Sequence, residues 1–307
     1  MIRLWVANTD LDWFDFLANQ PAIDEVNFWR PTGSHEFRAA KPGELFVFRL
    51  KSPRNVIGGY GVFSHASNLP ISLAWEAFGV KNGAASLQEM RERVGKYRRQ
   101  TATHEDYTIG YRIVTQPVFL PPDRWIPQPA SWARSIVVGK AYGTDTAEGR
   151  ALWEAVTTTD LAIPNPSSGF GEEQKRYGEP VLVKPRLGQG AFRIAVTDAY
   201  SRACAVSGGK VLPALDAAHI RPYGSGGSHE VSNGVLLRRD IHSVFDAGYV
   251  TIDEKLRFVV SDRVRTDFNN GNEYRRLHGT LVSVPAAQSL QPNLQALRWH
   301  NDERFLR

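Results

Sequence analysis

The chain contains one cysteine, Cys204, among its 307 residues. A disulfide within the chain and a zinc site built from several cysteines are therefore both excluded, and a lone thiol is typical of a reducing compartment, so we expect a cytoplasmic protein. No run of about 18 apolar residues occurs, and no membrane-spanning helix is expected. The first eight residues lack the apolar core and the cleavage site of a signal peptide, so we expect no secretory signal.

Length, hydrophobic content and charge set the broad class. A chain of 307 residues exceeds the usual length of one domain, so we expect two. A hydrophobic fraction of 42%, with 15 Phe, 10 Tyr and 8 Trp, supplies packed cores and excludes a disordered protein. The net charge of +5 favours a polyanionic partner, although many proteins with such an excess never bind nucleic acid.

The first 120 residues alternate short apolar runs with turns, which predicts a small, curved, mixed or antiparallel sheet with one or two helices. Expected strands cover residues 2–6, where apolar and polar residues alternate, and 44–50, 56–63, 110–115 and 116–119. Expected helices cover residues 13–20 and 86–99, and Ser86, with Glu89 three residues on, is the expected cap of the second. Glycines at 58, 59 and 61 interrupt one strand, which indicates a bulge or the close approach of another chain.

The remaining chain predicts a linker and a second domain. A helix is expected at 146–157, and the Pro- and Gly-containing stretch that follows predicts domains at 1–160 and 187–307 joined by a linker at 161–186. Within the second domain we expect a helix at 190–201, a strand at 211–219, a Gly- and Ser-rich loop at 221–232, a helix or helical turn at 233–245 and a hairpin over 249–260.

Three polar residues in this second domain are spaced as in a one-metal nuclease site: His219, Asn233 and His242. Phosphodiester hydrolysis needs an activated water, a cation on the phosphate and help for the departing oxygen. We predict that His219 is the general base and that Asn233 bonds into the loop and orients the His219 ring. We predict that His242 binds a divalent metal, Mg²⁺ or Mn²⁺.

A hard cation also requires oxygen ligands. Such sites commonly carry an acidic residue just before the base histidine, but here that residue is Ala218. Asp216 lies two positions earlier, on the same side of an expected strand, and is our candidate metal ligand. Asp240 and Asp246 are weaker candidates.

The segments 191–193, 198–200, 204–208, 218–220, 232–234 and 242–248 resemble the HNH endonuclease family, in the branch of bacterial restriction enzymes that cut modified DNA. The resemblance covers residues 187–260 and implies a ββα-metal fold, in which His219, Asn233 and His242 match the family's His, Asn and His. Two departures are Ala218 and the absence of cysteine-pair zinc knuckles, which leaves Cys204 as a buried thiol.

Other polar residues near these three have simpler interpretations. His229 lies in the Gly- and Ser-rich loop, and we expect it to be exposed to solvent and not catalytic. Arg221, Arg238 and Arg239 either are solvated or bind DNA phosphates.

Aromatic residues of the first domain suggest a pocket for a base. An enzyme that inspects one base takes it out of the stack and holds it between aromatic faces. The candidate pocket residues are Asn27, Phe28, Trp29, Tyr60 and Trp75, and each aromatic among them could instead be part of the core. A basic helix follows, whose residues either are solvated or grip the DNA backbone: Arg91, Arg93, Lys96, Arg98 and Arg99.

The strand layout of the first domain is similar to PUA-superfamily modules such as EVE, ASCH and SRA domains, whose EVE and SRA members read modified bases. The two resemblances together imply an α+β protein and a type IV-like, metal-dependent endodeoxyribonuclease. Its substrate would be double-stranded DNA carrying 5-methylcytosine or 5-hydroxymethylcytosine, and a homodimer could cut both strands. Two alternatives remain: an HNH nuclease or nickase indifferent to modification, and a non-catalytic DNA reader with a degenerate HNH fold.

Overall fold

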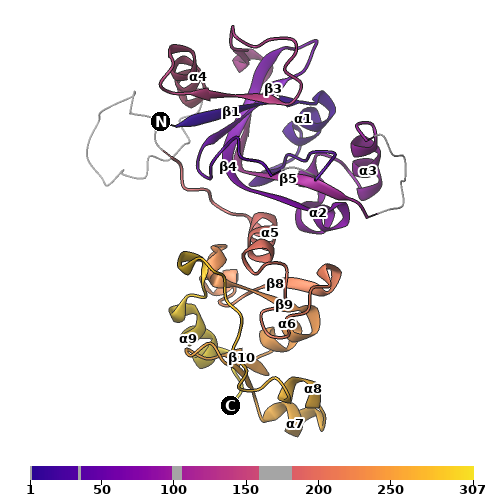
Figure 1. Ribbon diagram of the computed structural model, residues 1–307, viewed down its shortest axis with the longest axis vertical. Coiled ribbons are helices and arrows are strands. Elements are labelled where there is room, and N and C mark those ends of the chain that lie inside the picture. The colour runs from indigo at the N-terminus through magenta and orange to yellow at the C-terminus, as the bar shows by residue number, and fades with distance from the viewer. Residues whose placement is uncertain (1, 34–35, 99–105, 159–181) are drawn as a thin grey trace, which may run out of the picture. The chain divides into compact units, whose positions relative to one another are not determined.

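The computed structural model describes residues 2–33, 36–98, 106–158 and 182–307. The chain divides into two compact units, Met1–Arg186 and Leu187–Arg307 (Figure 1). The described residues include no helix that is both long and apolar enough to cross a membrane.

The N-terminal unit is an α+β unit, as predicted, and its described residues form one mixed seven-stranded sheet in the order β2-β5-β4-β3-β1-β7, with β6 paired to β4. Among the described strands of this sheet, only β1 and β3 run parallel to each other. The strands are β1 Arg3–Thr9, β2 Glu25–Asn27, β3 Leu45–Leu50, β4 Val56–Pro70, β5 Thr108–Phe119, β6 Ile126–Pro127 and β7 Gly139–Gly143. The helices are α1 Leu11–Ala18, α2 Ile71–Phe78, α3 Leu87–Gly95 and α4 Ala147–Thr158.

The central strand β3 is buried along its whole length because helices cover both faces of the sheet. Alternate side chains point to opposite faces, so Leu45 and Val47 pack in one core with Trp153 of α4. Phe46 and Phe48 pack in a second core with Phe14 of α1. The unbroken apolar run that predicted this strand therefore results from burial on two sides.

Glycines in β4 admit the neighbouring strand, as the sequence predicted. A Cβ at Gly59 would lie 2.2 Å from the Val118 carbonyl, and one at Gly61 would lie 2.4 Å from the Val114 side chain. The β4–β5 register shifts between Tyr60 and Val62, which is the expected irregularity. The strand predicted separately at 116–119 is the continuation of β5, and β4 runs on to Pro70.

The helix predicted at 86–99 is shorter, since α3 ends at Gly95, and it has the predicted start: the Ser86 hydroxyl accepts a hydrogen bond from the Glu89 amide. Of the predicted linker, residues 161–181 lie outside the described part. The described end of that stretch packs on the N-terminal unit, where the Val183 amide donates to the Gly43 carbonyl.

The C-terminal unit contains two small antiparallel ladders, β8–β9 and β10–β11, surrounded by helices (Figure 1). The strands are β8 Leu215–His219, β9 Gly234–Arg238, β10 Val250–Ile252 and β11 Phe258–Val260. The helices are α5 Gln189–Ala199, α6 Arg239–Asp246, α7 Arg263–Phe268, α8 Asn272–Arg275 and α9 Leu294–Glu303.

The helix predicted at 233–245 is wrong in its first half. Residues Gly234–Arg238 form β9, which pairs with β8 so that His219 lies opposite Gly234. The segment Val235–Leu237 is fully buried, and a continuous apolar run of this length is compatible with either a strand or a buried helix. The segment is a strand because it pairs with β8.

A buried histidine, His300 of α9, ties the C-terminal helix to the unit. It is 2% exposed, stacks on Phe245 of α6 at 3.8 Å and hydrogen-bonds the Thr251 hydroxyl and the Phe245 carbonyl. Burial lowers the pKa of His300 to about 4, although the Phe245 carbonyl opposes the shift.

We expect the C-terminal unit to lose stability as pH falls from about 6.5 to 4. The neutral imidazole is the folded form, so its contribution is complete above the unfolded pKa of about 6.5 and declines toward the folded pKa. At pH 5 the loss would be about 2 kcal/mol. Urea unfolding of the wild type and His300→Gln at pH 7.5 and pH 5 measures it. The variant should start less stable but depend less on pH, and equal pH dependence would contradict the assignment.

Candidate active site in the C-terminal unit

His219 lies at the end of β8, with its ring packed on the fully buried ring of Phe192 from α5. The two rings are parallel within 11° and 3.9 Å apart. Burial, followed by the charges of His229 and His242, lowers the pKa of His219 to about 4. The imidazole is therefore neutral near pH 7 and has the protonation state that a general base requires.

His229 is a functional candidate that the sequence interpretation placed wrongly. It is half-buried, and its Nδ1 lies 3.0 Å from the Nε2 atom of His219. Its ring also stacks on Tyr223, at 4.7 Å and 5°. The loop between β8 and β9 folds back over His219 and brings His229 with it, which composition alone does not reveal.

Asn233 holds this loop closed. Its Nδ2 donates to the carbonyls of Arg221 and Ser228, its Oδ1 accepts from the Arg221 amide, and its backbone carbonyl accepts from the Ile220 amide. It is 5% exposed, so each lost bond would leave a buried polar group unpaired. Gly227 permits the fold-back, since a Cβ there would lie 1.9 Å from the Arg221 carbonyl. The predicted bonds into the loop are present. None of these bonds reaches the His219 ring, and its orientation by Asn233 stays a prediction.

His242 of α6 lies between two carboxylates. Its Nδ1 is 3.3 Å from Asp216 of β8, and its Nε2 is 3.2 Å from Asp246, one helical turn along α6. Burial alone would lower the pKa of His242, but hydrogen bonds to Asp216 and then Asp246 raise it to about 9. Arg193 of α5 approaches the other oxygen of Asp216 at 3.5 Å. The structure therefore brings Asp216 and His242 together, as a shared metal site would require.

The donor types around His242 fit a divalent cation. Among the described residues, no three His, Cys, Asp or Glu side chains form a group that could hold a metal. One carboxylate and one imidazole nevertheless suffice for Mg²⁺ or Mn²⁺ sites that take their remaining ligands from water and substrate phosphate. Ala218 is fully buried, so an acid at that position would lie in the core, whereas Asp216 reaches His242.

The cationic residues predicted to bind DNA near this site are mostly engaged within the unit. Arg238 forms a two-pronged ion pair with Asp240, so these two side chains are engaged with each other. Arg221 bonds the Ser225 carbonyl and lies over the Trp299 ring. Arg239 is exposed at the start of α6.

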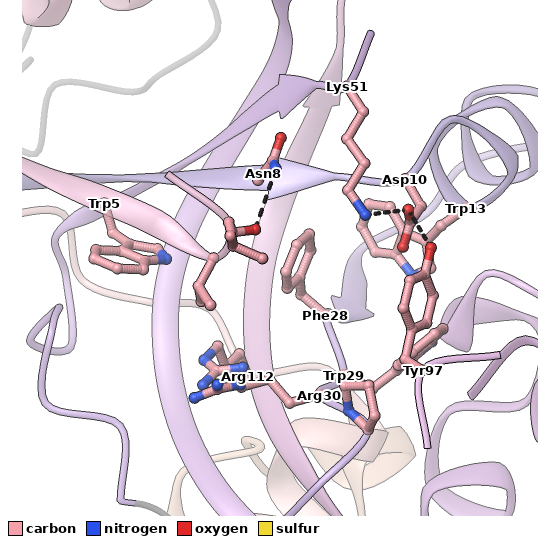
Figure 2. Close-up of a pocket in the computed structure, with 13 residues that line it drawn as sticks. Trp5, Asn8, Asp10, Trp13, Phe28, Trp29, Arg30, Lys51, Tyr97 and Arg112 are labelled. Carbon is pink, nitrogen blue, oxygen red and sulfur yellow. Dashed lines mark hydrogen bonds and ion pairs between the residues drawn. The ribbon is translucent and has the colours of Figure 1, made fainter. Parts of the chain in front are cut away.

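A cavity of about 220 Å³ opens in the N-terminal unit, and five of its 13 lining residues are aromatic (Figure 2). Trp29 is fixed there by a hydrogen bond from its Nε1 to the Asn82 carbonyl. The lining residues are Trp5, Asn8, Asp10, Trp13, Phe28, Trp29, Arg30, Pro31, Lys51, Tyr97, Arg112, Val137 and Val138.

Of the five predicted pocket residues, Phe28 and Trp29 line this cavity. Tyr60 does not: it is 1% exposed in the core because the glycines around it admit β5 and not a ligand. Asn27 is fully buried and donates to Asn82, and Trp75 lies on α2 away from the lining. The lining residues from β1, β5 and the segment after β6 are far apart in sequence, and no local pattern groups them.

The basic residues of α3 and of the segment that follows it also differ in their surroundings: some are engaged within the unit and others are exposed. Arg93 pairs with Glu89 and the Gly83 carbonyl, and Arg98 bonds the Pro31 carbonyl and lies over Tyr107. Arg91 is half-buried. Lys96 is exposed beside a second hollow that adjoins the cavity, and Arg99 lies outside the described residues.

Comparison with known proteins agrees with the C-terminal geometry. Residues 204–253 match the family described as HNH endonuclease. No curated protein matches the chain. Among solved structures, the ASCH protein from Zymomonas mobilis is similar over 49% of this chain and 93% of its own, at 10% identity and a TM-score of 0.33. The modification-dependent TagI restriction endonuclease is similar over 96% of this chain and 80% of its own, at 14% identity and a TM-score of 0.28. The C-terminal unit thus contains an HNH endonuclease domain, matched over residues 204–253.

Proposed function

We propose that this chain is a metal-dependent endodeoxyribonuclease that cuts DNA carrying modified cytosine, with recognition in residues 1–160 and hydrolysis in residues 187–307. The observation that carries the proposal is the presence, in one chain, of an HNH domain with His219, Asn233 and His242 and a separate aromatic-lined cavity in the N-terminal unit.

In hydrolysis, the neutral His219 imidazole takes a proton from the attacking water. Phe192 and His229 restrict its ring from the face and from the edge, so the base is positioned before substrate binds. Asn233 keeps the loop that carries His229 closed. These contacts supply the orientation that a general base needs and that an isolated histidine lacks.

His242 and Asp216 are the proposed metal ligands, with Asp246 beside the same ring. A divalent cation bound there would place positive charge on the scissile phosphate and on the departing oxygen. Before metal binds, the two carboxylates hold His242 protonated, so the chain must release that proton to present a nitrogen ligand.

In recognition, the cavity holds one base that has left the double helix. Its volume lies below the roughly 300–1,000 Å³ of common small-molecule sites, which suits a single planar ring. Stacking on aromatic side chains contributes about 1–3 kcal/mol per base. The PUA-superfamily likeness of the strand layout favours 5-methylcytosine or 5-hydroxymethylcytosine as this base. Lys96, and on the other unit Arg239, are exposed cations for the DNA backbone.

The test is one plasmid in unmodified, methylated and hydroxymethylated form, incubated with Mg²⁺ or Mn²⁺ and with an EDTA control. We expect a modified plasmid to be cut at least about fourfold faster, the factor that burial of one methyl group implies. Equal cutting of all three would support the nuclease indifferent to modification. Absence of cutting with every metal would support the non-catalytic reader.

A pair of tryptophan variants separates recognition from hydrolysis. We expect Trp29→Ala to remove the preference for modified plasmid, because the ring lines the cavity. The matched control is Trp75→Ala, since Trp75 is half-buried on α2 outside the cavity lining and should keep the preference. Initial rates on the modified and unmodified plasmids measure the difference, and a preference unchanged in Trp29→Ala would contradict the pocket assignment.

HNH domains of the usual arrangement cut one strand each, so a double-strand break would need two copies of the chain. The ratio of nicked to linear plasmid early in the reaction distinguishes a single cut from a paired one.

A further inference from the structure

A buried cation borders the N-terminal cavity without a counter-ion. Arg112 of β5 is 4% exposed, and the described residues give its guanidinium no ion pair. Its Nε atom is buried without a hydrogen-bond partner there, and its guanidinium lies over the face of Phe37 at 4.4 Å. A buried charge in this condition is costly, so its presence at a cavity wall needs an explanation.

A second cation lies beside it. Arg30 also lines the cavity, and its backbone is held against β5 by two hydrogen bonds with Gly110. Burial, and then the positive charge of Arg30, lower the pKa of Arg112 to about 9. Two like charges therefore share one end of the cavity, and no ion pair of either with a described residue is present (Figure 2).

The acidic group of the cavity is already neutralised. Asp10 accepts hydrogen bonds from Lys51 and from the Tyr97 hydroxyl, and these three side chains lie together in Figure 2, away from the two arginines. The cavity thus has aromatic side chains in its walls. At one end the charge of Asp10 is neutralised by Lys51, and at the other end the two arginines carry uncompensated positive charge. Such a site fits a planar ligand with an anionic group at one edge.

We propose that Arg112 and Arg30 form an oxyanion subsite of this cavity, which binds a carboxylate or a phosphate carried by the aromatic ligand. The identification of that ligand as a cytosine nucleotide rests on the proposed function. Two sources of the anion share this chemistry: a carboxylate on an oxidised 5-substituent of the base, and the phosphate of the nucleotide itself. Guanidinium groups bind either through paired hydrogen bonds.

Binding of three probes to the full-length protein tests the subsite: 5-methyldeoxycytidine, its 5′-monophosphate, and 5-carboxydeoxycytidine, measured by calorimetry. For the wild type, we expect one or both anionic probes to bind on the order of 10- to 100-fold more tightly than the neutral nucleoside, as charge-assisted hydrogen bonds imply. A gain with the monophosphate alone assigns the subsite to the backbone phosphate, and a gain with the carboxylate alone assigns it to the base.

Arg112→Met should abolish this gain, so that the anionic probes bind no more tightly than the neutral nucleoside. It should also keep or raise the melting temperature of the free protein, because it removes an uncompensated buried charge; a purely structural arginine would lower it. Arg30→Met tests the same loss of affinity for the anionic probes. It should disturb the core less, because Arg30 is only half-buried. The control is Arg38→Met, since Arg38 is exposed and pairs with Glu36.

Three results would overturn the inference: equal binding of all three probes, binding of none, or a gain that survives in both folded arginine variants. The outcome is independent of cleavage. A wild type that shows the gain but cuts all plasmids alike would retain the subsite and overturn the proposed function. A wild type that prefers modified plasmid but shows no gain with the anionic probes would support the proposed function and overturn the subsite.

Discussion

His219→Ala is expected to cut DNA about 10²- to 10⁴-fold more slowly than the wild type at saturating metal, which is the usual contribution of a positioned general base. The structure supports the size of this effect because the ring is neutral near pH 7 and is held by Phe192 and His229. Single-turnover rates on a supercoiled plasmid measure it, with circular dichroism to verify folding.

The matched control is His278→Ala, since His278 is exposed in the same unit and accepts one backbone hydrogen bond from Val260. It should retain nearly the full rate. His229→Ala should fall between the two, because His219 would keep its stack but lose its partner at Nε2. A His219→Ala protein that still cuts at the wild-type rate would remove His219 from the mechanism.

His242→Ala and Asp216→Asn are expected to reduce metal-dependent cleavage by roughly 10²-fold or more, and EDTA should stop the wild type. A change in a residue that only supports a metal ligand typically costs about 10- to 100-fold, so loss of a ligand itself should cost at least as much. Cleavage rates as a function of Mn²⁺ concentration, together with calorimetric Mn²⁺ binding, measure the loss. Asp240→Asn is the control on the same helix because Asp240 pairs with Arg238.

The metal prediction also has a pH signature. The pKa of His242 is about 9 in the metal-free protein, so at pH 7 the imidazole is protonated and metal must displace that proton. Apparent Mn²⁺ affinity should therefore rise as pH increases from 7 toward 9, by up to about tenfold per unit. Affinity that falls over this range, or full metal response in His242→Ala, would exclude His242 as a ligand.

The elements that the sequence predicted best are those whose signal is local. The alternation in 2–6, the apolar run at 44–50 and the Ser86–Glu89 cap each correspond to a described element, because side-chain parity and capping act over a few residues. The helix expected at 233–245 fails for the opposite reason: whether Val235–Leu237 is strand or helix depends on β8, about 20 residues earlier.

In the candidate site, too, local patterns predicted some residues, while others are placed only by the tertiary structure. Asp216 was a candidate from strand parity alone, and the structure places it 3.3 Å from His242. Its role as a ligand stays a prediction, as do those of His219, Asn233 and His242. The Gly- and Ser-rich composition of its loop predicts an exposed His229, whereas closure of the loop by Asn233 and Gly227 brings it to His219.

The sequence by itself determined the class of the protein: enough apolar residues for two domains, one cysteine, and a His–Asn–His pattern within the segment that matches the HNH endonuclease family. Those properties are carried by composition and by short spacings along the chain. Only the tertiary structure decided which side chains meet: His229 with His219, Asp216 with His242, and Arg30 with Arg112 at an aromatic cavity. Such contacts join segments up to about 80 residues apart, and their energies depend on burial and on neighbouring charges, which exist only once the chain has folded.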